Sequence, residues 1–95
     1  MRSPLFKFRL YVAGDTQHSA QATANLIALC QAHLAQRHEI EVVDVVRDPK
    51  RALADCIFMT PTLLKLAPLP LRRIVGTLNL TPHVLHALGL GSFIE

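Results

Sequence analysis

The chain has 95 residues, of which 51% are hydrophobic, and its ten basic and seven acidic residues give a formal net charge of +3. This length is sufficient for one domain, residues 1–95, and we expect its core to extend over about residues 5–90. No apolar run approaches the roughly 20 residues of a membrane span, and we expect no signal peptide, because the first residues have no apolar stretch of the required length. Two isolated cysteines do not make a secreted disulfide framework. We therefore expect a cytoplasmic protein that does not associate with membranes.

The basic residues are scattered along the chain, and they are accompanied by only four phenylalanines and one tyrosine. Nucleic-acid-binding surfaces combine a basic patch or stripe with aromatic rings on which bases stack. A solvated surface explains the present pattern without such a ligand. We therefore expect no nucleic-acid partner.

The first half of the chain contains two segments typical of strands. Apolar and polar residues alternate through residues 5–13, which predicts a half-buried strand with Lys7, Arg9 and Tyr11 on its polar face. The segment IEVVDVV predicts a second strand, centred on residues 42–46. The connection between them is long enough for a crossover, so we expect the two strands to be parallel.

Between these strands, apolar residues recur at spacings of three and four from about residue 19 to residue 36. This period predicts an amphipathic helix. Asp15, Thr16 and Ser19 each offer a side-chain oxygen that can accept hydrogen bonds at its start.

The second half predicts a short helix, a hairpin and a final helix. Asp48-Pro49 is typical of a helix start, with the acid as cap, and the helix over residues 50–57 would bury Ala52, Leu53 and Cys56. TLLKL and RRIVG predict two strands, and the link APLP is too short for a helical crossover, so they form an antiparallel hairpin. Thr81-Pro82 then predicts the start of the last helix.

The order βαβαββα is that of the thioredoxin fold. We therefore predict an α/β protein with a mixed four-stranded sheet and helices on both faces. Pro61 immediately precedes the third predicted strand, where the chain must turn sharply, and we expect the Thr60-Pro61 bond to be cis.

A redox thioredoxin needs a low-pKa cysteine where the first strand meets the first helix. Residues 14–19 contain no cysteine, and Cys30 and Cys56 are both interpreted as small core residues. The five histidines form no cluster of three or four ligands, so we expect neither zinc nor another cofactor. We predict that the protein is not an enzyme. The alternative is a thioredoxin-like thiol oxidoreductase with an unusual single-cysteine site.

Three segments resemble the KaiB family. RLYVAGDTQHS is similar to its signature LYVAG-N/D-T-x-x-S, and VVDVVRDP is similar to V-I-D-V-x-x-N/D-P. TPTLLKLAPLPLRRIVG is similar to TPTL-x-K-x-x-P-x-P-x-RRI-x-G almost residue for residue. The resemblance covers about residues 8–90. It implies a circadian-clock component, or a paralogue of one, acting as a non-catalytic adaptor that binds the KaiC ATPase ring in the thioredoxin-like state.

On this interpretation the basic residues are the candidate contacts with the partner. Arg72 and Arg73 are the first choice, and Lys65, Lys7 and Arg9 follow. The alternative for the arginine pair is that its charge only protects an edge strand from pairing.

The sequence also departs from the family pattern. Glu41 stands where the family commonly has lysine, Thr77 replaces an acidic residue, and the sequence ends in GLGSFIE instead of an acidic tail. These changes are compatible with KaiC binding and argue against KaiA sequestration.

The family is known for two folds, and the alternative to the thioredoxin-like state is a ground state with a rearranged second half, usually a tetramer. Ala87 replaces a frequent glycine and favours a last helix, which Gly89 is placed to terminate. We therefore predict a mainly monomeric protein in the thioredoxin-like state.

Overall fold

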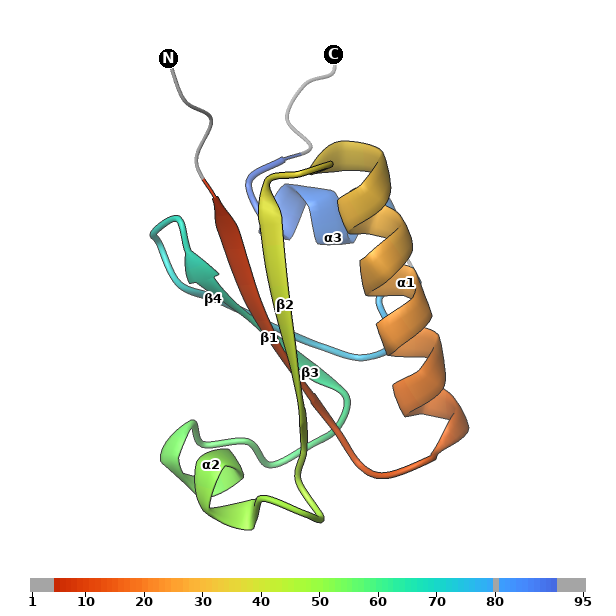
Figure 1. Cartoon of the computed structure of the whole chain (residues 1–95), viewed down its shortest axis with the longest axis vertical. Coiled ribbons are helices and arrows are strands. Elements are labelled where there is room, and N and C mark those ends of the chain that lie inside the picture. Colours follow the sequence, from red (N-terminus) through yellow and green to blue (C-terminus); the bar gives the residue numbers. More distant parts are fainter. Residues whose placement is uncertain (1–4, 80, 91–95) are drawn as a thin grey trace.

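The computed structural model describes residues 5–79 and 81–90. Within them, four strands form one mixed sheet and three helices pack around it (Figure 1). The predicted order βαβαββα is confirmed. The elements are β1 (Phe6–Val12), α1 (Gln17–His33), β2 (His38–Asp44), α2 (Pro49–Ala54), β3 (Thr62–Ala67), β4 (Arg72–Val75) and α3 (Thr81–Ala87).

The sheet has the strand order β2-β1-β3-β4, so β2 and β4 are its two edges. β1 pairs with β2 in parallel and with β3 in antiparallel orientation. β3 and β4 form the predicted antiparallel hairpin. The expected parallel pairing and hairpin are therefore both confirmed.

Each face of the sheet has its own apolar cluster, because side chains alternate between the faces along a strand. On one face, α1 and α3 pack against the apolar side of β1, with Leu10 and Leu26 fully buried. On the other face, Ala52 of α2 packs with Tyr11, Val43 and Leu64. The predicted placement of helices on both faces is confirmed.

The start of α1 is fixed by two of the three predicted oxygens. The Thr16 hydroxyl accepts a hydrogen bond from the backbone N–H of Ser19 at 3.2 Å. The Ser19 hydroxyl accepts one from the N–H of Ala13 at 3.0 Å, which ties the helix to the end of β1. Asp15 is exposed and is not the cap.

The predicted centre of the second strand was wrong. β2 ends at Asp44, whose carboxylate accepts from the N–H groups of Gly14 at 3.2 Å and Val46 at 2.9 Å. These bonds turn the chain away from the sheet, so the apolar run continues into a loop where Val46 is exposed.

The short helix was predicted too long. α2 ends at Ala54, and Cys56 adopts a left-handed conformation with φ +57°, which no helix continues. Cys56 is exposed in the segment after the helix, and Leu53 is exposed within it, so only Ala52 of the predicted inner face is buried. Asp48 makes no side-chain cap, although Pro49 does begin the helix.

The prediction of a cis bond before Pro61 is confirmed, and Pro61 is buried. The bonds before Pro68 and Pro70 in the hairpin loop are cis as well.

The last helix ends in a Schellman motif. Gly89 has φ +80°, its N–H donates to the carbonyl of His86 at 3.0 Å, and the N–H of Leu90 donates to the carbonyl of Leu85 at 2.8 Å. Gly89 therefore terminates α3 as predicted. Ala87 is the last residue of the helix rather than an interior one. The segment GLGSFIE lies outside the described residues from Gly91 onward.

None of the described helices is long and apolar enough to cross a membrane.

Candidate partner-binding surface

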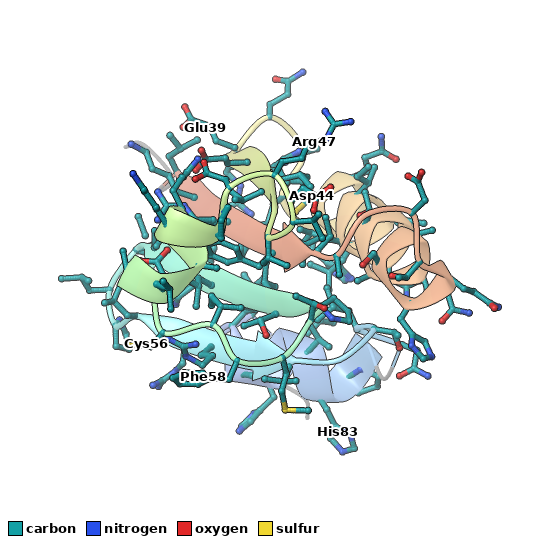
Figure 2. All side chains as sticks on the ribbon, turned by 90° about the horizontal axis from the view of Figure 1, so that it is seen from below. Glu39, Asp44, Arg47, Cys56, Phe58 and His83 are labelled. Atoms are coloured by element: carbon teal, nitrogen blue, oxygen red, sulfur yellow. The ribbon has the colours of Figure 1, made fainter. Side chains whose placement is uncertain are left out.

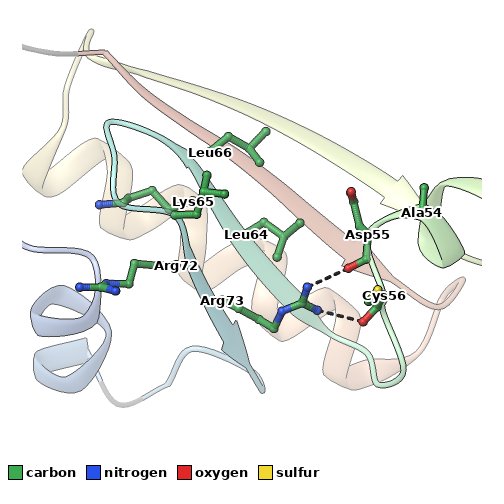
Figure 3. A pocket seen from close by; sticks show the side chains of 9 residues that line it. Ala54, Asp55, Cys56, Leu64, Lys65, Leu66, Arg72 and Arg73 are labelled. Carbon is green, nitrogen blue, oxygen red and sulfur yellow. Dashed lines mark hydrogen bonds between the residues drawn. The ribbon is translucent and has the colours of Figure 1, made fainter.

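Arg72 and Arg73 are exposed on β4, at a free edge of the sheet. Arg72 is paired with Lys65 of β3 and Arg73 with Leu64. Because successive side chains of a strand alternate, the two arginines point to opposite faces. Arg73 is directed toward the segment after α2, and Arg72 lies on the side of α3 (Figure 3). The pair therefore spans the edge and does not lie on a single face.

The Arg73 guanidinium donates hydrogen bonds to two backbone carbonyls, those of Asp55 at 2.7 Å and Cys56 at 3.1 Å (Figure 3). These bonds hold its side chain in place but do not neutralise its charge. Within residues 5–79 and 81–90, no carboxylate lies within ion-pair distance of Arg72 or Arg73. The positive charge of this edge is therefore available to a partner.

Lys65 has a different environment from the arginines, since its residue is only 4% exposed. Its ammonium donates to the carbonyl of Leu88 at 3.3 Å, just beyond α3, and lies 5.7 Å from the centroid of the Phe6 ring. Burial lowers the pKa of Lys65, and the charge of Arg72 lowers it further. A cation is stabilised at a helix C-terminus, so Lys65 stabilises the end of α3. Its contact with a partner stays a prediction.

Lys7 and Arg9 lie on the α2 side of the sheet, with Lys7 exposed and Arg9 partly buried. Arg9 is ion-paired twice, at 2.9 Å to Glu41 and at 2.9 Å to Asp55. The five predicted basic residues are therefore distributed over both faces. Arg73 shares a face with Lys7 and Arg9, whereas Arg72 shares the other with Lys65.

A polar network fastens α2 to the sheet. The Tyr11 hydroxyl donates to the Asp55 carboxylate, which also accepts from Arg9. Glu41 accepts from Arg9 and forms an ion pair with Arg51 at 2.7 Å. The hydrogen bond from Tyr11 is the main cause that lowers the pKa of Asp55, and burial raises the pKa of Tyr11. Two arginines thus balance the negative charge of Glu41, which stands where the family commonly has lysine.

Sequence reasoning missed the roles of Tyr11 and Asp55. The alternation through β1 puts Tyr11 on the same side of the strand as Lys7 and Arg9, and this position was the available signal for its role. For Asp55 no local signal existed, because its partners are 44 and 46 residues away along the chain.

The two cysteines differ. Cys30 is buried as predicted, and burial raises the pKa of its thiol to about 11, so it is protonated near neutral pH. Cys56 is exposed beside Phe58 at the surface (Figure 2), so its placement in the core was wrong. Among the described residues, no group of three or more His, Cys, Asp or Glu side chains could hold a metal ion.

Two hollows flank β4. One, of about 510 Å³, lies toward α2 and has Leu64, Leu66 and Leu71 in its lining. The other, of about 440 Å³, lies between β4 and α3 and includes Ile74 and His83. Arg73 lines both hollows.

A family model described as the KaiB domain matches residues 9–90. The chain belongs to the KaiB family. Circadian clock protein KaiB3 of a Synechocystis species is 42% identical over 82 residues, which cover 86% of this chain and 80% of that protein. Circadian clock oscillator protein KaiB of Synechococcus elongatus is 40% identical with the same coverage. The resemblance stated from the three motifs is confirmed.

Solved structures support the fold. The N-terminal domain of SasA from Synechococcus elongatus aligns with a TM-score of 0.66 at 20% identity, covering 100% of this chain and 93% of that one. Mitochondrial thioredoxin 3 of Saccharomyces cerevisiae aligns with a TM-score of 0.72 at 19% identity, covering 93% and 81%. The thioredoxin-like fold predicted from element order is therefore confirmed.

Proposed function

We propose that this KaiB-family chain is a non-catalytic, cytoplasmic adaptor that binds a KaiC-type ATPase ring in the thioredoxin-like state, as a clock component or in a related pathway. The observation that carries the proposal is the pair Arg72 and Arg73 at the free edge β4, whose charges no described carboxylate neutralises. Uncompensated surface charge favours association with a partner of opposite sign.

The environment of Cys30 supports a non-catalytic role, because a protonated and fully buried thiol cannot act as a nucleophile. The oxidoreductase alternative now depends on Cys56 alone. Insulin reduction in the presence of dithiothreitol distinguishes the two functions: turnover that a Cys56→Ser substitution abolishes would favour the enzyme.

We further propose that KaiA is not sequestered. Glu41 on the edge strand β2 reverses the charge of the lysine that the family commonly has there, and Arg9 and Arg51 hold its carboxylate within the fold. A partner surface that is complementary to lysine therefore meets the opposite charge.

The test is a double charge reversal, Arg72→Glu with Arg73→Glu, and the measurement is the affinity for a KaiC-type hexamer in the presence of ATP. We expect affinity to fall at least about tenfold, which corresponds to about 1.4 kcal/mol. The matched control reverses two exposed cations elsewhere, Arg47→Glu with Lys50→Glu, and should change affinity little. A folded Arg72/Arg73 double variant that keeps its affinity would show that the pair only protects the edge strand.

A further inference from the structure

The backbone of β4 has hydrogen-bonding groups that β3 does not use. The N–H of Gly76 donates to the carbonyl of Pro61 at 2.9 Å, directly beside the pair Thr62 and Val75. In an antiparallel ladder, hydrogen-bonded and non-hydrogen-bonded pairs alternate. Val75 and Arg73 are therefore in non-hydrogen-bonded pairs, and their N–H and C=O groups point away from β3.

These outward groups have no partner within residues 5–79 and 81–90. Val75 is 51% exposed, so water reaches this part of the edge. A row of unpaired donors and acceptors on an edge strand is a template for pairing with another extended chain.

The side-chain surroundings fit such an addition. The hollow of about 510 Å³ lies on one face beside β4 and the hollow of about 440 Å³ on the other, and Arg73 lines both. An added strand directs its side chains alternately to the two faces. Successive side chains would thus enter one hollow and then the other, and both hollows have apolar walls, formed by residues such as Leu71 and Ile74.

Charge selects the occupant. A second copy of this chain, pairing β4 with β4, would bring four arginines together on one short ladder, and like charges on facing strands are destabilising. Two consecutive acidic residues would instead meet Arg72 on one face and Arg73 on the other, because successive side chains of a strand point to opposite faces. The apolar walls of both hollows favour apolar residues on either side of this acidic pair.

We propose that β4 is a strand-addition site that accepts an extended segment from a protein partner, in which two consecutive acidic residues are flanked by apolar residues. The inference rests on the proposed adaptor function only for the identity of that partner. Pairing uses the N–H and C=O groups of Arg73 and Val75, and the two arginine side chains select for acid.

The first test uses the wild-type protein and two short synthetic peptides, one with two consecutive glutamates flanked by valines and the other with two consecutive lysines flanked by valines. Backbone amide chemical shifts are followed during titration. We expect the glutamate peptide to shift the amides of Arg73 and Val75 most and to bind at least about tenfold more tightly than the lysine peptide. Equal binding of the two peptides, no binding, or shifts centred on another element would overturn the proposal.

The second test removes one outward donor. A Val75→Pro substitution deletes an N–H that β3 does not use, and an edge strand tolerates proline at such a position. The control Val75→Thr keeps the N–H. We expect affinity for the glutamate peptide to be lost in the proline variant and kept in the threonine variant. Equal binding by both folded variants would refute backbone pairing. If the proline variant does not fold, the wild-type titration decides.

The two proposals fail separately. A hexamer that binds the wild type but not the Arg72/Arg73 double variant, together with absence of peptide binding, leaves the adaptor function standing and removes strand addition. If the peptide binds at β4 but the wild type does not bind the hexamer, strand addition stands and the adaptor function is removed.

Discussion

The two edges of the sheet, β2 and β4, use their charges in different ways. At β2, Glu41 is held by Arg9 and Arg51, and Arg9 also pairs with Asp55 next to α2. At β4, the arginines lie on opposite faces and have no carboxylate partner among the described residues. Similar exposed charges thus stabilise the fold at one edge and remain available for binding at the other. Charge in the sequence alone does not distinguish these uses.

The largest effect on stability should come from the network behind β2. Replacing Asp55 by Asn removes the charge that Tyr11 and Arg9 contact, and we expect the free energy of unfolding at pH 7 to fall by about 1 to 3 kcal/mol. Affinity for the partner should change much less, because β4 is not part of this network. A thermal or urea unfolding curve measures the first quantity, and a variant as stable as the wild type would contradict the role of Asp55.

The same variant makes a prediction about pH. The pKa of Asp55 is lowered from its ordinary value of 3.8. The contribution of its carboxylate to folding stability is therefore fully present above that value and is lost as pH falls through the lower pKa of the folded state. The stability difference between wild type and Asp55→Asn should therefore be constant near neutral pH and shrink below about pH 3.9. If the stability difference between the two proteins instead grows on acidification, the pKa of Asp55 is not lowered in the folded state.

A smaller effect is expected from Glu41→Lys, which places a third cation beside Arg9 and Arg51. Exposed ion pairs contribute little individually, so we expect a loss of about 0.5 to 1 kcal/mol in the free energy of unfolding. The matched control is Glu39→Lys on the same strand, since Glu39 is exposed and forms no ion pair within the described residues. Equal losses in the two variants would mean that Glu41 is not specifically held.

The smallest stability change concerns α3, which forms one wall of a hollow beside β4. Replacing Ala87 by Gly should weaken the helix by less than about 1 kcal/mol, because Ala87 is its last residue. If the two family folds are closely balanced in this chain, secondary chemical shifts of residues 81–88 should then move toward extended values. Ala24→Gly on the exposed side of α1 is the control, and it should leave those shifts unchanged.

The first half of the fold could be predicted because its signals are local. The alternation through β1 and the hydroxyls of Thr16 and Ser19 fix a strand and a helix start within a few residues. The end of β2 could not be predicted, since the apolar run continues to Val46 and only the bonds from Gly14 and Val46 to Asp44 end the strand.

The candidate site was predictable only where its features depend on local sequence. A period of two places Arg72 and Arg73 on opposite faces of any strand that contains both. The burial of Lys65 depends on the ring of Phe6 and the carbonyl beyond α3, which lie far away in sequence and meet it only in the folded chain. Long-range partners of this kind leave no periodic signal.

The proposed adaptor function requires that this chain binds a KaiC-type ATPase ring. The most direct measurement is size-exclusion chromatography of the wild-type chain mixed with a KaiC-type hexamer in the presence of ATP. We expect co-elution with the hexamer, and loss of co-elution when Arg72 and Arg73 are both replaced by glutamate. Separate elution of the folded wild-type chain, at concentrations well above those of a micromolar interaction, would contradict the claim.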